Sequence, residues 1–444
     1  MTHFRKIHRP LTAAGLTLPV AVLGLLSIGP RPAAAQTATP PAAPGAQPPG
    51  LWIDGIHFSA QIEGGITFNP ASPNDGVNFG QLFTDRANQP LLNQVLLTAN
   101  KPLDPKATGI DWGFKLQVMY GSDARYTHFL GEFVNALTSR NQVDIVEANV
   151  LLHLPYLTAG GIDIKAGQYV TPIGYEGIDP SANLFYSHSY NFNFAAPDKH
   201  TGILTTTHVN ALLDVYLGVD SGVNTSLGDG DNNGAAAVLF GIGLNMLDGN
   251  LTLLALSHIG PENATRLLSP LGFNANGYMR YLNDTVLTWK ATDKLTLVTE
   301  ATWIRDDFDA FFGTGKPGTS NGYGVAQYAS YTLTDTVTLN ARGEVFRDGG
   351  INGAGFWVAA FPGNNDFVKA ESGLANGSFT TTAPTTYSEI TLGVTYKPSL
   401  PAPITGLLIR PEIRWDSALN GTKAFDNGTR TNALTIAADF VLTF

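Results

Sequence analysis

Charged side chains recur at alternate positions in several segments of this 444-residue chain. One such segment reads Asn340, Arg342, Glu344, with small apolar residues between the polar ones. A period of two places these groups on one face of a β-strand. Rows of basic and acidic groups on one wall attract or repel ions, so the chemistry they support is electrostatic selection of solutes. The candidate residues are Lys115, Glu147, Lys165, Glu300, Arg342, Glu344, Glu389, Arg410, Glu412 and Arg414.

Motifs for catalysis or metal binding do not occur in the sequence. Cysteine is absent, which excludes disulfides, thiolate metal sites and cysteine nucleophiles, and there is no H-E-x-x-H or G-x-S-x-G motif. Residues 229–234 match the start of a calcium loop, but Phe240 stands where that loop needs a bidentate glutamate. We therefore predict no catalytic residue, metal or cofactor. A hydrolase using His153, His208 or His258 beside a serine is kept as an alternative.

The last segment of the chain, residues 434–444, shows the elements that would carry such charges. Leu434, Ile436 and Phe440 share one face of a period-two strand, and Asp439 lies on the other. The segment has the length of about 9–11 residues that a tilted strand needs to cross a bilayer. A half-buried strand of a soluble sandwich also alternates, so this segment alone does not decide the fold class.

Residues 111–120 alternate in the same way and carry an aromatic residue, Trp112 or Tyr120, near each end of the apolar face. Transmembrane strands with interfacial aromatic belts have this feature, and soluble core strands rarely do. Similar segments are joined alternately by short turns and long polar connections, provided that the weaker segment 91–100 is also a strand. The sequence predicts an all-β fold, a closed antiparallel transmembrane β-barrel of about 16 strands with short periplasmic turns and long external loops.

Closure of the barrel follows from the hydrogen-bonding needs of the backbone. Backbone amides that face hydrocarbon must be paired within the protein, which for strands requires a sheet without edges. We therefore expect residues 434–444 to pair with the first strand, residues 56–68. A barrel of this size is too wide for its side chains to fill, so an aqueous channel is expected.

The beginning of the chain has the features of a cleaved signal peptide over residues 1–35. Basic residues precede an apolar run, which ends in three alanines. A retained membrane helix is the alternative. Residues 36–50 are almost wholly Ala, Pro, Gly, Thr and Gln and are expected to form an extended periplasmic tether. Residues 51–444 are then the transmembrane β-barrel.

The charge balance excludes one class of partner. Of the 26 Lys and Arg residues, four lie in residues 1–35 (Arg5, Lys6, Arg9 and Arg31), so 22 remain against 36 Asp and Glu, a formal net charge of −14. This excess of negative charge argues against nucleic acid as a partner.

Assigning the apolar faces to lipid places the candidate charges in the lumen, because a charge on the lipid face costs roughly 2–4 kcal/mol near the midplane. Arg342, Arg410 and Arg414 would form a basic wall that attracts anions, with the nearby glutamates able to neutralise it. The alternative is that each charge only solvates the lumen or pairs across strands. Residues 280–289 carry apolar groups on both faces, so no inward face is assigned there.

The long connection over residues 171–199 is unusually aromatic for an exposed loop. It contains Tyr175, Phe185, Tyr186 and Tyr190. Folding into the lumen, where the loop would form a constriction, explains this composition. Packing on the barrel rim or against a neighbouring subunit explains it equally well.

Three runs of residues carry a resemblance to a known family. Residues 120–125 (YGSDAR), 167–176 (GQYVTPIGYE) and 183–190 (NLFYSHSY) resemble those of the OmpL-like type 2 family of beta-barrel porins. The resemblance covers the chain from residue 51 and implies an outer-membrane porin without naming a solute. The final Phe444 also resembles the terminal aromatic residue that the bacterial barrel-assembly machinery recognises.

Together these features predict a non-enzymatic porin in the bacterial outer membrane. Small hydrophilic solutes or ions would diffuse passively through its charged aqueous lumen. Its expected partners are outer-membrane lipid, these solutes and the barrel-assembly machinery, which would bind the C-terminal strand, and a homotrimer is the expected assembly. The alternatives are a structural or adhesive barrel plugged by its loops and an outer-membrane barrel hydrolase.

Overall fold

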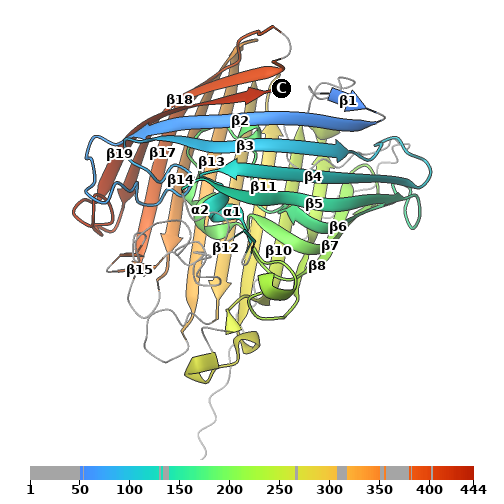
Figure 1. Ribbon diagram of the computed structural model, residues 1–444, viewed down its shortest axis with the longest axis horizontal. Coiled ribbons are helices and arrows are strands. Elements are labelled where there is room, and N and C mark those ends of the chain that lie inside the picture. Colours follow the sequence, from blue (N-terminus) through green and yellow to red (C-terminus); the bar gives the residue numbers. More distant parts are fainter. Residues whose placement is uncertain are drawn as a thin grey trace, which may run out of the picture. The chain divides into compact units, whose positions relative to one another are not determined.

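The computed structural model describes residues 51–53, 55–129, 132–133, 140–265, 269–307, 318–350, 355–356, 380–381, 383–401 and 404–444. Within these residues, sixteen strands form one antiparallel sheet in which each strand pairs with its neighbours in sequence (Figure 1). They are β2 (Ile56–Phe68), β3 (Pro90–Lys101), β4 (Asp111–Gly121), β5 (Gln142–Leu154), β6 (Ile162–Val170), β7 (Lys199–His208), β8 (Leu213–Asp220), β9 (Ala237–Met246), β10 (Leu251–Pro261), β11 (Met279–Lys290), β12 (Leu295–Asp306), β13 (Ser320–Thr334), β14 (Val337–Asp348), β17 (Thr385–Tyr396), β18 (Gly406–Ala418) and β19 (Asn432–Thr443).

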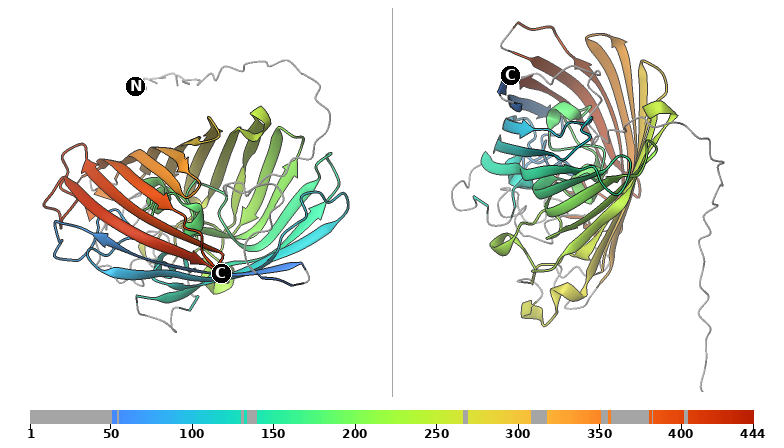
Figure 2. Two further views of the ribbon diagram at one scale, coloured as in Figure 1. Left: turned by 90° about the horizontal axis from the view of Figure 1, so that it is seen from above. Right: turned by 90° about the vertical axis from the view of Figure 1, so that its right-hand side faces the viewer.

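The sheet closes on itself where the last strand meets the first (Figure 2). β19 runs antiparallel to β2, from the pair Ile436 and Phe68 to the pair Thr443 and Gln61. Beyond the strand, the backbone N–H of Phe444 donates to the carbonyl of Ala60 at 2.9 Å. The predicted closure between the C-terminal segment and the first strand is therefore confirmed, as is the sixteen-stranded barrel.

Connections between the strands alternate in length, as the sequence predicts. β3, the weak segment of the sequence, is a full strand, and only nine residues separate it from β4. The turn between β9 and β10 is shorter and contains the 3-10 helix η3 (Leu247–Gly249). Leu247, Asp248 and Gly249 all have positive φ angles, of 50°, 53° and 87°. Such angles are easiest for Gly and tolerated by Asp, which explains why Asp248-Gly249 marks this turn.

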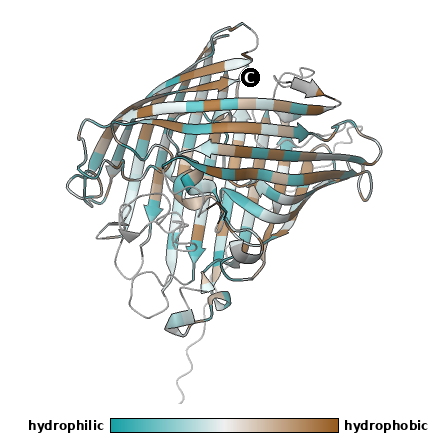
Figure 3. Ribbon diagram, in the orientation of Figure 1, coloured by the Kyte–Doolittle hydropathy of each residue, from teal (hydrophilic) through white to brown (hydrophobic). Residues whose placement is uncertain are grey.

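Apolar and polar side chains alternate along the strands, so the two faces of the barrel differ (Figure 3). Outward-pointing residues are large and exposed: Trp112 is 59% exposed and Tyr120 41%. Met119, which precedes Tyr120 and points inward, is completely buried. The same pattern surrounds the barrel, with exposed aliphatic and aromatic side chains outside and buried charged groups inside. This surface suits a hydrocarbon environment, as expected for a transmembrane barrel.

The remaining elements are short. β1 (Leu51–Ile53) pairs with β2, and β15 (Gly355–Phe356) pairs with β16 (Thr380–Thr381). The helices are α1 (Ala124–Thr127), α2 (Tyr190–Ala195), η1 (Pro180–Ala182), η2 (Gly228–Gly230), η4 (Ser269–Leu271) and η5 (Ala275–Gly277). Within the described residues, no helix is both long and apolar enough to cross a bilayer. α2 is the helix that matters for the interior, because it lies against β12, β13 and β14.

The seam between β19 and β2 yields a test. Deleting Phe444 removes its two backbone hydrogen bonds with Ala60, each worth about 0.5–1.5 kcal/mol. We expect less protein to reach the membrane in its folded form, while the conductance of each assembled barrel stays unchanged. Quantifying the folded barrel in isolated outer membranes measures this. The Phe444→Tyr variant keeps both bonds and the aromatic ring and serves as control; normal levels of the truncated protein would contradict the prediction.

Candidate functional site

Of the ten charged residues predicted to line the lumen, eight are buried inside the barrel, and Lys115 and Lys165 are partly buried. On β14 and β18 the inward positions carry Arg342, Arg410 and Arg414, and their outward neighbours, such as Ile413, are exposed. Several of these charged residues are covered by the chain itself. A segment of residues 171–198, which we term the inner loop, enters the barrel between β6 and β7 and covers part of the wall (Figures 1 and 2).

Carboxylates of the wall hold the inner loop by its backbone N–H groups. Glu412 accepts from the N–H of Tyr186 at 2.8 Å and from that of Ser187 at 3.2 Å. Glu344 accepts from the N–H groups of Tyr190 and Asn191 at 2.6 and 2.7 Å. These two N–H groups are the first of α2 and have no partner within the helix, which makes a carboxylate well suited to them.

Further along the wall, Glu300 and Asp284 hold the start of the inner loop. Glu300 accepts from the N–H of Tyr175, and Asp284 from the N–H of Gly174, both at 3.2 Å. Four wall carboxylates therefore satisfy loop amides that would otherwise be buried without partners.

Arginines of the wall donate to the carbonyl groups of the same loop. Arg410 donates to the carbonyls of Pro180 and Asn183 at 2.7 and 2.8 Å. Arg342 donates to the carbonyl of Ser187 at 2.7 Å. Arg414 likewise donates to His188, at 2.5 Å. The wall thus contacts both the donors and the acceptors of the loop backbone.

Each arginine is also paired with a carboxylate. Arg342 lies 2.6 Å from Glu389, and Arg414 lies 2.8 Å from Asp416. Arg410 pairs with Asp439 and, at 3.3 Å, with Glu63. The three arginine side chains are at most 1% exposed. The open basic wall expected from the sequence is therefore absent at these positions, because its charges are neutralised and covered by the loop.

The inner loop contributes one carboxylate of its own, that of Glu176. It accepts from Arg342 at 2.7 Å, from the N–H of Ser189 at 2.9 Å, and contacts His188 at 2.9 Å. Burial acts to raise the pKa of Glu176, but the Arg342 guanidinium and the contact with His188 lower it to about 2. The ion pair with Arg342 therefore stays charged down to strongly acidic pH.

All four aromatic residues singled out in the sequence pack on the interior. Tyr190 donates to Asp416 at 2.5 Å, and Tyr186 to Asn93 at 2.9 Å. The ring of Phe185 lies 5.1 Å from the Arg342 guanidinium, a cation–π distance. The ring of Tyr175 lies 4.6 Å from that of Tyr328. The loop is thus folded inward rather than onto the rim.

Another part of the wall, on β4, β5 and β6, is less covered. Lys115 and Glu147 form an ion pair at 2.7 Å, and the Lys115 side chain is 34% exposed. Lys165 is partly buried, with its ammonium 5.7 Å from the ring of Tyr169. Lys115, Glu147 and Lys165 are thus predicted lining residues on strands other than β14 and β18, which carry Arg342, Arg410 and Arg414.

Glu63, Asp284 and Asp439 also take part in these contacts, with Arg410 or with the inner loop, but were not among the ten candidate residues. Asp284 lies on β11, where the inward residues Leu282 and Val286 are themselves buried. Because apolar residues lie on both faces of this strand, alternation in the sequence does not show which face points inward. Its inward polar residues Arg280 and Asp284 alternate with the apolar Leu282 and Val286, so the inward face was not evident from the sequence.

The histidines considered for hydrolysis have acidic partners in the described contacts. His153 and His208 both contact Asp163, at 2.6 and 3.2 Å. His258 contacts Asp220 at 3.0 Å. None of these contacts places a serine hydroxyl beside an imidazole, which a serine hydrolase requires.

In the run 229–234, Asp231 accepts from two backbone N–H groups of its own turn, those of Asn233 and Gly234.

Comparisons with known proteins agree with this architecture. A family model described as "Putative beta-barrel porin-2, OmpL-like" matches residues 55–444. A search of curated protein sequences finds no match. Among solved structures, the chain is similar to the outer membrane channel DcaP of Acinetobacter baumannii, with 9% identity, a TM-score of 0.52, and coverage of 89% of this chain and 100% of that one.

Two further structures show the same fold. Salmonella typhi OmpF, solved in complex with daunomycin, has 10% identity and a TM-score of 0.54 over 89% of this chain and 99% of its own. An anion-selective porin from Comamonas acidovorans has 9% identity and a TM-score of 0.50 over 88% and 99%. At these identities the likeness concerns the fold alone.

The anchoring of the inner loop can be tested at Arg342. Arg342→Met leaves Glu176 and Glu389 without their shared cation, and breaking a buried pair in this way costs about 3–5 kcal/mol. We expect a lower free energy of unfolding in lipid vesicles and a larger single-channel conductance, because the loop is held less firmly. Arg347→Met, on the same strand but bonded to Thr386 outside this network, is the matched control. Equal stability and conductance in both variants would refute the anchoring role.

Proposed function

The chain belongs to the OmpL-like beta-barrel porin-2 family and is an outer-membrane porin, and on this basis we propose how solutes pass through it. Small hydrophilic solutes diffuse passively along the part of the wall that the inner loop leaves open. The observation that carries this proposal is a contrast in exposure: the side chain of Lys115 is 34% exposed, whereas those of Arg342 and Arg414 are completely buried. The passage therefore follows β4, β5 and β6.

The charges along this passage have both signs. Lys115 and Lys165 lie on either side of Glu147, and Asp179 of the inner loop, which accepts from Gln61 at 3.0 Å, adds a second negative group near Lys115. Opposite charges close together give a small net field. The lumen therefore favours hydrated, polar solutes and discriminates only weakly between anions and cations.

The inner loop forms the constriction of this passage. Its support is the number of independent contacts that hold it, from Glu300 and Arg342 through to Glu412. A segment tied to the wall at both its N–H and its carbonyl groups keeps a fixed position. It narrows the lumen as part of the wall rather than as a moving lid.

We extend the proposal to processing and assembly. Residues 1–50 lie outside the described residues. We propose that residues 1–35 are removed on export, that residues 36–50 serve as a periplasmic tether, and that the barrel-assembly machinery recognises the C-terminal strand ending in Phe444. The exposed apolar belt contacts outer-membrane lipid. The barrel assembles as a homotrimer, as porins often do, and the proposal includes no enzymatic step.

Conductance in a planar lipid bilayer tests the pore directly. Purified full-length porin is expected to insert and give stepwise increases in current, because an aqueous passage remains beside the inner loop. Heat-denatured protein at the same concentration is the control. Protein that inserts without any current step would instead indicate a barrel plugged by its loops.

Charge reversal locates the passage. Lys115→Glu with Lys165→Glu changes the local charge by four units, and each unit contributes roughly 0.5 kcal/mol to an ion about 8 Å away in water. We expect the reversal potential in a KCl gradient to shift toward cation selectivity, with the K⁺ to Cl⁻ permeability ratio rising several-fold. Lys106→Glu, an exposed position in the turn between β3 and β4, is the control. A shift equal to that of the control would place the passage elsewhere.

A further inference from the structure

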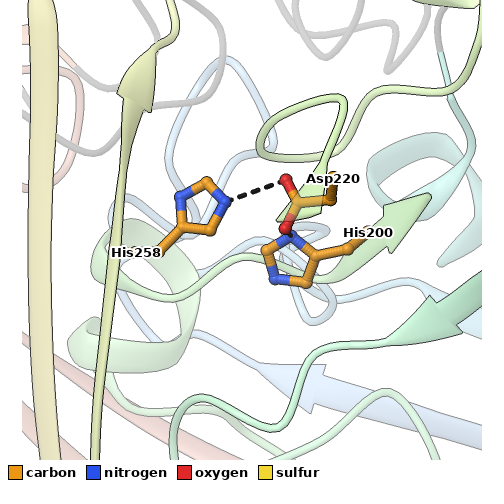
Figure 4. Close-up of side chains that lie close together, drawn as sticks. All are labelled: His200, Asp220 and His258. Carbon is orange, nitrogen blue, oxygen red and sulfur yellow. Dashed lines mark hydrogen bonds and ion pairs between the residues drawn. The ribbon is translucent and has the colours of Figure 1, made fainter. Parts of the chain in front are cut away.

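One group of described side chains has the composition and spacing of a metal site. His200 lies on β7, Asp220 ends β8 and His258 lies on β10 (Figure 4). One ligand atom from each lies within 4.8 Å of the other two. Nε2 of His258 is 3.0 Å from one oxygen of Asp220, and Nδ1 of His200 is 3.4 Å from the other. Both imidazoles therefore present a nitrogen to the same carboxylate.

The group is sealed from solvent and incompletely hydrogen-bonded. The side chains of His200, Asp220 and His258 are all 0% exposed. Nδ1 of His200 and one carboxylate oxygen of Asp220 have no hydrogen-bond partner of good geometry. Buried polar atoms are rarely left in this state, so each such atom calls for an explanation. A cation between the imidazoles and the carboxylate would use both atoms.

The second nitrogen of each imidazole faces a group that would orient it. Nδ1 of His258 lies 3.7 Å from Glu262, whose other oxygen accepts from the N–H of Val223 at 2.9 Å. Nε2 of His200 lies 3.0 Å from the hydroxyl of Thr171. Metal-binding histidines characteristically direct their free nitrogen to a carboxylate or another oxygen, which fixes the tautomer and the ring. His200 has such a hydrogen-bond partner in Thr171, and Glu262 lies beside Nδ1 of His258 at a slightly longer distance.

Neighbouring cations do not occupy this position. Lys199, next to His200 in sequence, is paired with Asp144 at 2.6 Å. Arg280, on the strand adjacent to His258, is paired with Asp306 at 2.6 Å. A divalent cation held by two neutral imidazoles would balance the negative charge of the buried Asp220.

We propose that His200, Asp220 and His258 together bind one zinc ion. Two imidazole nitrogens and one carboxylate oxygen are ligands that zinc prefers, whereas calcium and magnesium prefer oxygen alone. Zinc bonds of about 2.0–2.2 Å hold tetrahedral ligand atoms about 3.3–3.6 Å apart. Binding would therefore draw together the ligand atoms that lie up to 4.8 Å apart and lengthen the 3.0 Å contact of His258 with Asp220. Glu262 and Thr171 act as positioning residues.

The consequence of such an ion would be structural. Thr171 begins the inner loop, and Val223 and Glu262 lie in the loops after β8 and β10. The ion with its positioning residues would link three loops to three strands at one point. A zinc ion that binds only the folded state stabilises the folded barrel. Removal of the zinc should therefore loosen all three loops together.

Zinc binding to the purified, untagged full-length porin tests the proposal. We expect isothermal titration with ZnCl₂ to give one ion per chain, not displaced by equimolar Mg²⁺ or Ca²⁺. Asp220→Asn and His258→Gln should abolish this stoichiometric binding, and Glu262→Gln should weaken it by about 10–100-fold. His57→Gln, which changes a buried histidine on β2 beside Asn100, is the matched control and should bind as the unaltered protein does.

Two results would overturn the proposal: no stoichiometric zinc in the unaltered protein, or unchanged zinc affinity in both folded variants Asp220→Asn and His258→Gln. If these variants do not fold, X-ray absorption at the zinc edge of the unaltered, zinc-loaded protein decides. Scattering from two imidazoles supports the site. Scattering from one imidazole or none refutes it.

Discussion

The seam between β19 and β2 is the constraint on which the rest of the structure depends. A strand inside a bilayer can satisfy its backbone groups only on its neighbours, so the sheet must have no free edge. Closure with sixteen strands fixes the circumference and leaves an interior that one layer of side chains cannot fill. Every charged group on the inner face must then find water or another part of the chain.

The inner loop supplies much of what the wall lacks. Arg342, Arg410 and Arg414 are completely or almost completely buried, which is costly for a charge unless carboxylates and hydrogen-bond acceptors surround it. Each guanidinium donates to at least one wall carboxylate and to at least one loop carbonyl. Wall and loop are therefore complementary, and the less covered charges lie on β4, β5 and β6, around Lys115.

The strands were predictable because their signal is local. Alternation and turn residues place the strands within a few residues of their observed ends. The regular alternation of short and long connections identified β3 despite its weak pattern. The partners inside the barrel were not predictable, because Arg410 and Pro180 are 230 positions apart and nothing in either segment records the contact. The same aromatic residues would be buried whether the loop folds into the lumen or packs on the barrel rim. Residues such as Tyr186 therefore did not distinguish the two arrangements. His200, Asp220 and His258 converge only through the register of three strands.

The wall holds the inner loop mainly through hydrogen bonds to the peptide groups of the loop. Glu344 and Glu412 accept from main-chain N–H groups, and Arg410 donates to main-chain carbonyls. Such contacts are indifferent to which side chain the loop residue carries. Mutations can therefore change the loop side chains that meet the solute while the backbone contacts with the wall stay in place. The selectivity of the porin can then change without any change in the barrel. In related sequences, the anchoring wall residues should drift more slowly than the loop residues that they hold.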